Sequence, residues 1–236
     1  MPAFILKIIA LATMLIDHTG AVFPGFAPDW FRTVGRASFV LFVFLIAESC
    51  RHTRSMEKYL FRLGLFALIS QIPFSLAFGH GFKDISFIES TNVFYTLFLG
   101  VLCVYSYQFL QKAKSRLSVL LIIPYAAALG YLAVFLDTDY DLFGVLFVLL
   151  VYVMPNKPLR LLALAGLCLA VYGDALWWFV TTGNQRFLSI GHYWNLFASL
   201  SAVVLAAFYN GKRGPSMKWL FYAAYPAHLL LFALIK

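Results

Sequence analysis

Apolar runs recur along the whole chain and are separated by short polar connections that hold most of the charged residues. A helix needs about 20 apolar residues to cross the hydrocarbon core of a bilayer, and this pattern predicts nine membrane spans. The predicted spans are Phe4–Phe23, Trp30–Cys50, Tyr59–Phe78, Asn92–Gln111, Leu117–Leu136, Tyr140–Met154, Leu159–Val180, Leu188–Tyr209 and Trp219–Ile235, of which the sixth is the shortest. We therefore expect an all-α fold, a polytopic helical bundle that forms one transmembrane domain over residues 1–236.

Composition agrees with this interpretation. Of the 236 residues, 62% are hydrophobic and 12% are charged, and the mean hydropathy is +0.84. Soluble domains contain about 25% charged residues, so the chain is an integral membrane protein by composition. The cysteines Cys50, Cys103 and Cys168 lie inside apolar runs without a paired spacing, which is typical of small buried hydrophobic residues. We expect no metal site.

The basic residues indicate how the spans are oriented. The net charge is +8, and 13 of the 18 Lys and Arg residues fall on one side of the predicted arrangement against 5 on the other. Short cytoplasmic loops are enriched in Lys and Arg, so we expect a cytoplasmic N-terminus and an external C-terminus. This placement in short loops accounts for the positive charge, and we expect no nucleic-acid partner.

Polar residues inside the predicted spans become informative once topology gives them a depth. At a rise of 1.5 Å per residue, His18 lies about 20 Å from the inner end of the first span, in the outer half of the membrane, and His228 lies nearer the middle. The same reasoning places in the outer half Arg36, Gln71, Asn92, Asp174, His192 and Asn195. Polar groups at membrane depth face protein or a wet cavity. We expect a membrane-embedded site that opens toward the outer face.

His18 is the strongest candidate for chemistry in that site. The unperturbed pKa of histidine, about 6.5, suits proton transfer near neutrality. Adjacent residues on a helix point about 100° apart, so Asp17 is poorly placed to orient His18. We expect Asp17 to pair with Arg36, and Asp174 to hold the imidazole of His18. Lys7 and His18 share one helix face and could line a single path from the cytoplasmic mouth to the outer end.

Several separated motifs resemble the TraX family over essentially the whole chain. They are LKIIALATMLIDHTG, GRASFVLFVFLIAESCRHTR, ALISQIPF, STNVFYTLFLG, YDLFGVLFVLL and FYAAYPAHLLL. TraX family members are associated with conjugal transfer, and the type member N-acetylates the amino terminus of the conjugative pilin subunit. The resemblance implies a multi-pass protein of the bacterial cytoplasmic (inner) membrane.

TraX-like proteins in turn resemble a wider group of multi-span membrane acyltransferases, in which a basic residue on the first helix is followed eleven positions later by a catalytic histidine. Lys7 and His18 reproduce that spacing, although Lys7 replaces the usual Arg and Asp17 is additional. This resemblance implies that acetyl-CoA is the acyl donor and enters from the cytoplasm. The acceptor at the outer face would be a pilin or another envelope component, a glycan or a lipid.

Roles for the remaining candidates follow from this implied activity. His18 would act as the general base or briefly carry the acetyl group, and the developing oxyanion would be stabilised by Arg36, Asn92 or His228. Phosphate groups of CoA attract basic side chains. The donor-binding candidates are Lys7, Arg51, His52 and Arg54, the last three because they match the family's motif.

A second hypothesis comes from another class of protein. A proton-coupled transporter or flippase would also place His and Asp residues in its spans as a relay. The sequence has no clear inverted repeat and no matching pair of helices broken by Gly or Pro, which such transporters often have. A purely structural pilus-assembly subunit would leave the embedded charges unexplained.

Overall fold

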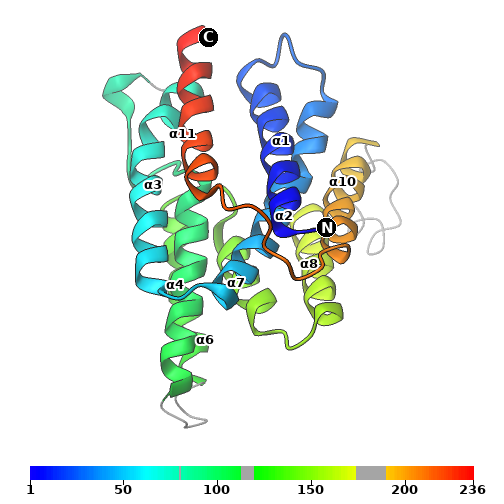
Figure 1. The fold of residues 1–236 in the computed structure, drawn as a ribbon. Helices are drawn as coiled ribbons and strands as arrows, with labels where there is room; N and C mark the ends of the chain where they lie inside the picture. The colour runs from blue at the N-terminus through cyan, green and yellow to red at the C-terminus, as the bar shows by residue number, and fades with distance from the viewer. Residues whose placement is uncertain (80, 113–119, 174–189) are drawn as a thin grey trace, which may run out of the picture. The chain divides into compact units, whose positions relative to one another are not determined.

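The computed structural model describes residues 1–79, 81–112, 120–173 and 190–236, and this part of the chain is helical (Figure 1). Within it there are no β-strands, and Thr91 and Thr138 form an isolated bridge. The described helices are α1 (Ala3–Val22), α2 (Trp30–His52), α3 (Met56–Ala77), the short 3₁₀ helix η1 (Phe82–Asp84), α4 (Val93–Lys112), α6 (Ile122–Phe135), α7 (Asp141–Val153), α8 (Lys157–Tyr172), α10 (Ile190–Ala207) and α11 (Lys218–Ile235).

Each predicted span corresponds to a helix, but the prediction of nine spans is wrong. By length and composition, five of the described helices could cross a membrane, namely α1, α2, α3, α4 and α11. The helices α6, α7 and α8 have 14, 13 and 16 residues. A 13-residue helix extends about 20 Å, which is less than the roughly 30 Å of a hydrocarbon core. The chain is thus a helical membrane protein with at least two classes of helix.

Local sequence signals explain where several helices begin. Ser55 precedes α3, and its hydroxyl accepts a hydrogen bond from the Lys58 amide at 3.3 Å. Asn156 precedes α8, and its side-chain oxygen accepts from the Leu159 amide at 3.0 Å. These side chains satisfy amide groups that have no partner inside the first helical turn. They fix the helix starts at positions where hydrophobicity alone changes gradually.

The chain divides into two compact units. Unit 1 contains residues 1–45, residues 154–221 and Lys236, and unit 2 contains residues 46–153 and 222–235. Unit 1 holds α1, most of α2, α8, α10 and the start of α11, and in it α8 packs against α10. The segment after α10 runs beside the start of α1, where the Asn210 amide donates to the Met1 carbonyl at 3.0 Å.

Unit 2 is built around α4, which packs against α3, α6 and α7. Gly100 of α4 faces Val148 of α7, where an added Cβ would come within 2.8 Å of the valine Cβ. Small residues of this kind let membrane helices approach closely. The core between α4, α6 and α7 consists of buried aliphatic residues and one cysteine, namely Leu99, Cys103, Ile122, Ala126, Leu129, Ala133 and Val145.

Candidate functional site

The inward face of α1 carries His18 at one end of an otherwise apolar stripe. Leu6, Ala10, Met14 and His18 are all buried and follow one another every four residues. His18 is 8% exposed. Lys7 is half-buried at the edge of the same stripe, as expected for two residues eleven positions apart on a 3.6-residue repeat. The prediction that Lys7 and His18 lie near one helix face therefore agrees with the burial pattern.

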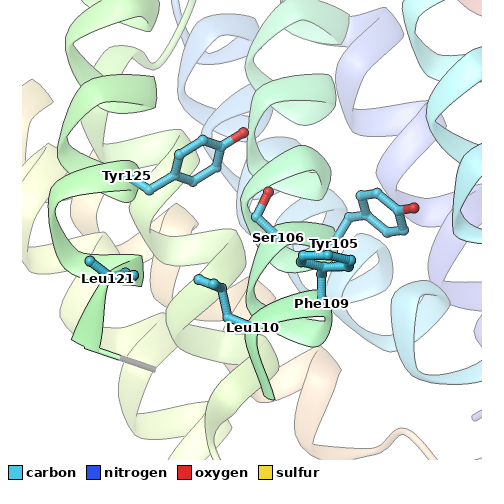
Figure 2. A pocket seen from close by; sticks show the side chains of 6 residues that line it. All are labelled: Tyr105, Ser106, Phe109, Leu110, Leu121 and Tyr125. Atoms are coloured by element: carbon cyan, nitrogen blue, oxygen red, sulfur yellow. The ribbon is translucent and has the colours of Figure 1, made fainter. Parts of the chain in front are cut away.

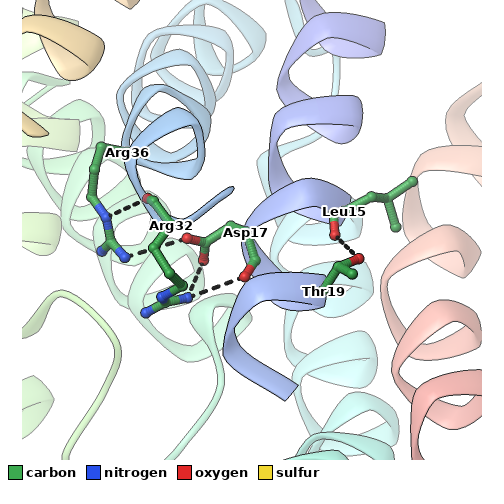
Figure 3. A network of polar contacts seen from close by, with 5 residues as sticks. All are labelled: Leu15, Asp17, Thr19, Arg32 and Arg36. Carbon is green, nitrogen blue, oxygen red and sulfur yellow. Dashed lines mark hydrogen bonds and ion pairs between the residues drawn. The ribbon is translucent and has the colours of Figure 1, made fainter. Parts of the chain in front are cut away.

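Asp17 is the centre of a charged network between α1 and α2 (Figure 3). One carboxylate oxygen accepts from Arg32 at 2.7 Å, and the other accepts from Arg36 at 3.3 Å. Arg32 also donates to the backbone carbonyl of Asp17 at 3.3 Å, and Arg36 donates to the backbone carbonyl of Arg32 at 2.9 Å. The predicted pairing of Asp17 with Arg36 is confirmed. Two guanidinium groups share one carboxylate, so the three charged side chains sum to a positive charge.

The backbone geometry of this network depends on Gly35. Any side chain at position 35 would overlap the carboxylate and the Cβ of Asp17. Gly20 of α1 similarly faces Phe31, whose Cβ would lie 3.0 Å from an added Cβ. Close approach at these two glycines brings the Asp17 side chain within reach of both arginines.

Arg32 was not among the predicted site residues. It lies inside the predicted span Trp30–Cys50, and α2 begins at Trp30 as that span does. The signal that could have identified it is its spacing from Arg36, because residues four apart lie on the same face of a helix. Asp174, the predicted partner of His18, lies outside the described residues.

Asn92 belongs to unit 2, where it forms a buried polar cluster with Gln71. The Asn92 side-chain amide donates to the Gln71 side-chain oxygen at 2.8 Å and to the Ala67 carbonyl at 2.9 Å. The Gln71 amide donates in turn to the carbonyls of Ser86 and Ser90, at 2.8 and 3.1 Å. Both residues are fully buried. Because both Asn92 amide hydrogens are already donated, its contacts are those of a structural residue that fastens the segment after α3.

His228, also in unit 2, lies within a row of aromatic rings on α11. Its ring centroid is 5.6 Å from that of Tyr225 and 5.5 Å from that of Phe232. Its Nδ1 lies 2.8 Å from the Ala224 carbonyl one turn earlier in the same helix. The row continues through Tyr225 to Phe94 of α4. These contacts hold the imidazole in a fixed orientation inside the unit.

The predicted donor-binding motif lies at the end of α2, in unit 2. Arg51 lies 3.5 Å from the Glu48 carboxylate, donates to the carbonyls of Val151 and Tyr152, and stacks over the Tyr152 ring at 5.0 Å. His52 is largely exposed, 3.9 Å from Glu48, and Arg54 is exposed in the turn before α3. Arg51 therefore fastens the end of α2 to the end of α7.

A shallow apolar pocket of about 330 Å³ lies between α4 and α6 (Figure 2). Its lining contains none of the predicted site residues and consists of Tyr105, Ser106, Phe109, Leu110, Leu121 and Tyr125. Among the described residues, no three His, Cys, Asp or Glu side chains gather as metal ligands would. Candidate chemistry in the described residues therefore rests on His18 and the charged network beside it.

Comparison with known proteins assigns the chain to a family. Residues 3–236 match the family model described as TraX protein. The chain belongs to the TraX family. A relative in Dichelobacter nodosus, "Probable fimbrial assembly protein FimC, serogroup H1", is 29% identical over 250 aligned positions, which cover 99% of this chain and 95% of the relative. No solved structure matches this TraX family member.

Proposed function

We propose that this TraX family member is a membrane-embedded acetyltransferase of the bacterial cytoplasmic membrane. It would move an acetyl group from cytoplasmic acetyl-CoA to an acceptor at the outer face. The observation that carries the proposal is a buried histidine on the apolar inward face of α1, with a lysine near the same face eleven residues earlier. An ionisable residue within a membrane span is by default a candidate for a functional site. The Dichelobacter nodosus relative is named as a probable fimbrial assembly protein, and the acceptor we propose is accordingly a fimbrial or pilus subunit.

His18 is the residue to which we assign the proton transfer. Its imidazole takes a proton from the acceptor amine as the amine nitrogen attacks the acetyl carbonyl, and the carbon–sulfur bond then breaks to release CoA as a thiolate, which takes up a proton. His18 is 8% exposed, so the helices around it must part enough to admit the acetyl group. In this proposal Arg36 supplies positive charge near the reacting carbonyl.

The proposed orientation places the N-terminus in the cytoplasm. α1, α2, α3, α4 and α11 cross the membrane in this arrangement. The shorter helices form two pairs, α6 with α7 and α8 with α10, which pack together. If both helices of a pair cross the membrane, or if neither does, the chain leaves the pair on the side where it entered. The orientation of the five long helices is then unchanged, and basic residues remain enriched on the cytoplasmic side.

The test measures transfer of labelled acetyl groups from acetyl-CoA to a peptide with a free N-terminal amine. We expect His18→Gln to lose about 100-fold or more of the rate, because general base catalysis contributes about 10²–10⁴. Thr19→Ala is the matched control, since its hydroxyl donates only to the Leu15 carbonyl of its own helix, at 2.8 Å (Figure 3). It should transfer at the wild-type rate.

The same assay in oriented vesicles tests the sidedness. Inverted vesicles, which expose the cytoplasmic face, should use added acetyl-CoA, and right-side-out vesicles should not. A folded His18→Gln variant that transfers normally would overturn the role of His18. Solute that crosses the bilayer in exchange for protons, with no acetyl group joined to the acceptor, would favour a transporter instead.

A further inference from the structure

We propose that Lys7 and the basic loop, defined as residues 209–218, bind the phosphate groups of an adenine nucleotide thioester. This inference rests on the proposed function, because the ligand would be the acetyl-CoA donor. It moves the phosphate site away from the end of α2, where the motif at Arg51 and Arg54 predicted it, and into unit 1.

The basic loop is fastened to the start of α1. The Ala3 amide donates to the Lys212 carbonyl at 2.8 Å, and the Phe4 amide donates to the Arg213 carbonyl at 3.1 Å. Gly214 has a φ of 72° and lies so close to α1 that an added Cβ would come within 2.9 Å of the Phe4 Cβ. Only glycine adopts that conformation without strain. The backbone of the loop is therefore held in place while its charged side chains remain exposed.

In the described residues of unit 1 outside α2, the segments around the basic loop supply no acidic residue to balance its charges. The loop that carries Arg213 is fastened to Phe4, one helical turn before Lys7 on α1, so like charges gather in this region and repel each other. The segments 1–16, 154–173 and 190–221, which make up most of unit 1 outside α2, contain no Asp or Glu. Arg213 donates to the neutral hydroxyl of Ser216 at 3.3 Å. A bound phosphate would replace this repulsion with charge-assisted hydrogen bonds.

Two other basic residues of unit 1 differ from this group. Lys157 donates to the carbonyls of Ala207 and Tyr209, the latter at 2.8 Å, and so caps the end of α10. Arg160 donates to the Met154 carbonyl at 3.3 Å. The preference for basic residues in cytoplasmic loops explains why all of these residues lie on one side. It does not explain why Lys157 and Arg160 donate to carbonyl groups, while Lys7 lies over an aromatic ring and Arg213 donates to a serine hydroxyl.

Aromatic rings beside these charges suit the nucleotide base. The Lys218 ammonium lies 5.5 Å from the ring of Trp219, whose side chain is 59% exposed. The Lys7 ammonium lies 5.7 Å from the ring of Phe221, which also packs edge-on against Phe4. An exposed indole can stack on a flat base, and cations beside it can hold phosphates. The combination favours a nucleotide over inorganic phosphate.

The experiment measures binding of CoA and of 3′,5′-ADP to the full chain in phosphatidylcholine nanodiscs. We expect the double variant Lys212→Gln, Arg213→Gln to bind both ligands about tenfold more weakly or worse, and Lys7→Met to do the same. Quenching of Trp219 fluorescence on CoA addition, lost in Trp219→Phe, would support stacking. Lys83→Gln is the control, because it removes one charge on η1, which is far in the sequence from the basic loop and from the end of α2. This variant should bind CoA as the wild type does. Unchanged thermal unfolding would show that the variants fold.

The outcomes separate this inference from the proposed function. If Arg51→Gln or Arg54→Gln abolishes CoA binding and the loop variant binds normally, the inference fails while the acetyltransferase stands. If the loop variant retains less phosphatidylglycerol than the wild type when both are purified from mixed-lipid nanodiscs, but CoA binding is unchanged, the loop recognises lipid phosphates, and the nucleotide assignment is overturned. If the wild type binds CoA without transferring acetyl groups and the loop variant loses that binding, the inference stands and the proposed function fails.

Discussion

Gly35→Ala tests the close approach of α1 and α2 at the charged network. Gly35 lies inside α2, where replacing glycine by alanine normally favours the helix by about 1 kcal/mol. Here the new methyl group would overlap both the carboxylate and the Cβ of Asp17. The Cβ cannot rotate away, so the two helix backbones must separate.

The opposing effects can be compared in magnitude. Overpacking of this kind costs about 1–3 kcal/mol. Loss of the Asp17 ion pairs adds about 1 kcal/mol, a small amount because the Arg32 side chain is 44% exposed and can turn toward water. After the helix-propensity gain is subtracted, we expect Gly35→Ala to lower the free energy of unfolding by about 1–3 kcal/mol.

Gly64→Ala is the matched control because Gly64 also lies inside a helix, α3. An added Cβ there would lie 3.3 Å from the ring edge of Phe98, which can move. We expect this variant to be neutral or slightly more stable. The assay is thermal or denaturant unfolding of purified protein in detergent. If Gly35→Ala is as stable as Gly64→Ala, the helices do not approach as described. Gly35→Ala should also remain destabilising in an Asp17→Ala background, because the Cβ of residue 17 is kept.

Two further predictions concern unit 2. Asn92→Ala removes the hydrogen bonds to Gln71 and Ala67. We expect it to lower the free energy of unfolding, measured in denaturant, by about 2–4 kcal/mol. A change below about 0.5 kcal/mol would contradict the structural role assigned to Asn92. Asp137 has a φ of 45°, in the left-handed region, which glycine adopts easily and valine does not. In thermal unfolding, we expect Asp137→Gly to unfold at the wild-type temperature or higher, and Asp137→Val to unfold at a lower temperature. The reverse order would argue against this backbone conformation.

The positions of the helices could be predicted from hydrophobic runs, but the number of spans could not. The run before residue 136 and the run after residue 140 look like two spans in the sequence. In the structure, α6 begins only at Ile122, and the connection to α7 turns through left-handed residues at Asp137 and Asp141. Left-handed backbone at a non-glycine residue is set by tertiary contacts, here including the hydrogen bond from Thr91 to the Leu136 carbonyl. Such contacts are invisible to a hydropathy pattern.

The candidate site could be predicted in part for similar reasons. The pairing of Asp17 with Arg36 followed from the 100° angle between neighbouring helix residues, which turns Asp17 away from the direction of His18. The engagement of Arg51 with Tyr152 could not be foreseen, because these residues lie far apart in the sequence. Nothing in the sequence around either residue indicates that the guanidinium of Arg51 would stack on the ring of Tyr152.

The shared carboxylate of Asp17 has a consequence for motion. Arg32 and Arg36 are four residues apart on α2, a distance of about 6 Å along the axis, and both contact the same carboxylate. If α2 slid by one turn along α1, Phe31 or Phe39 would take the place of Gly35 against Asp17, where any side chain overlaps. Sliding is therefore blocked by packing, and the carboxylate keeps both arginines in one register of α2 against α1.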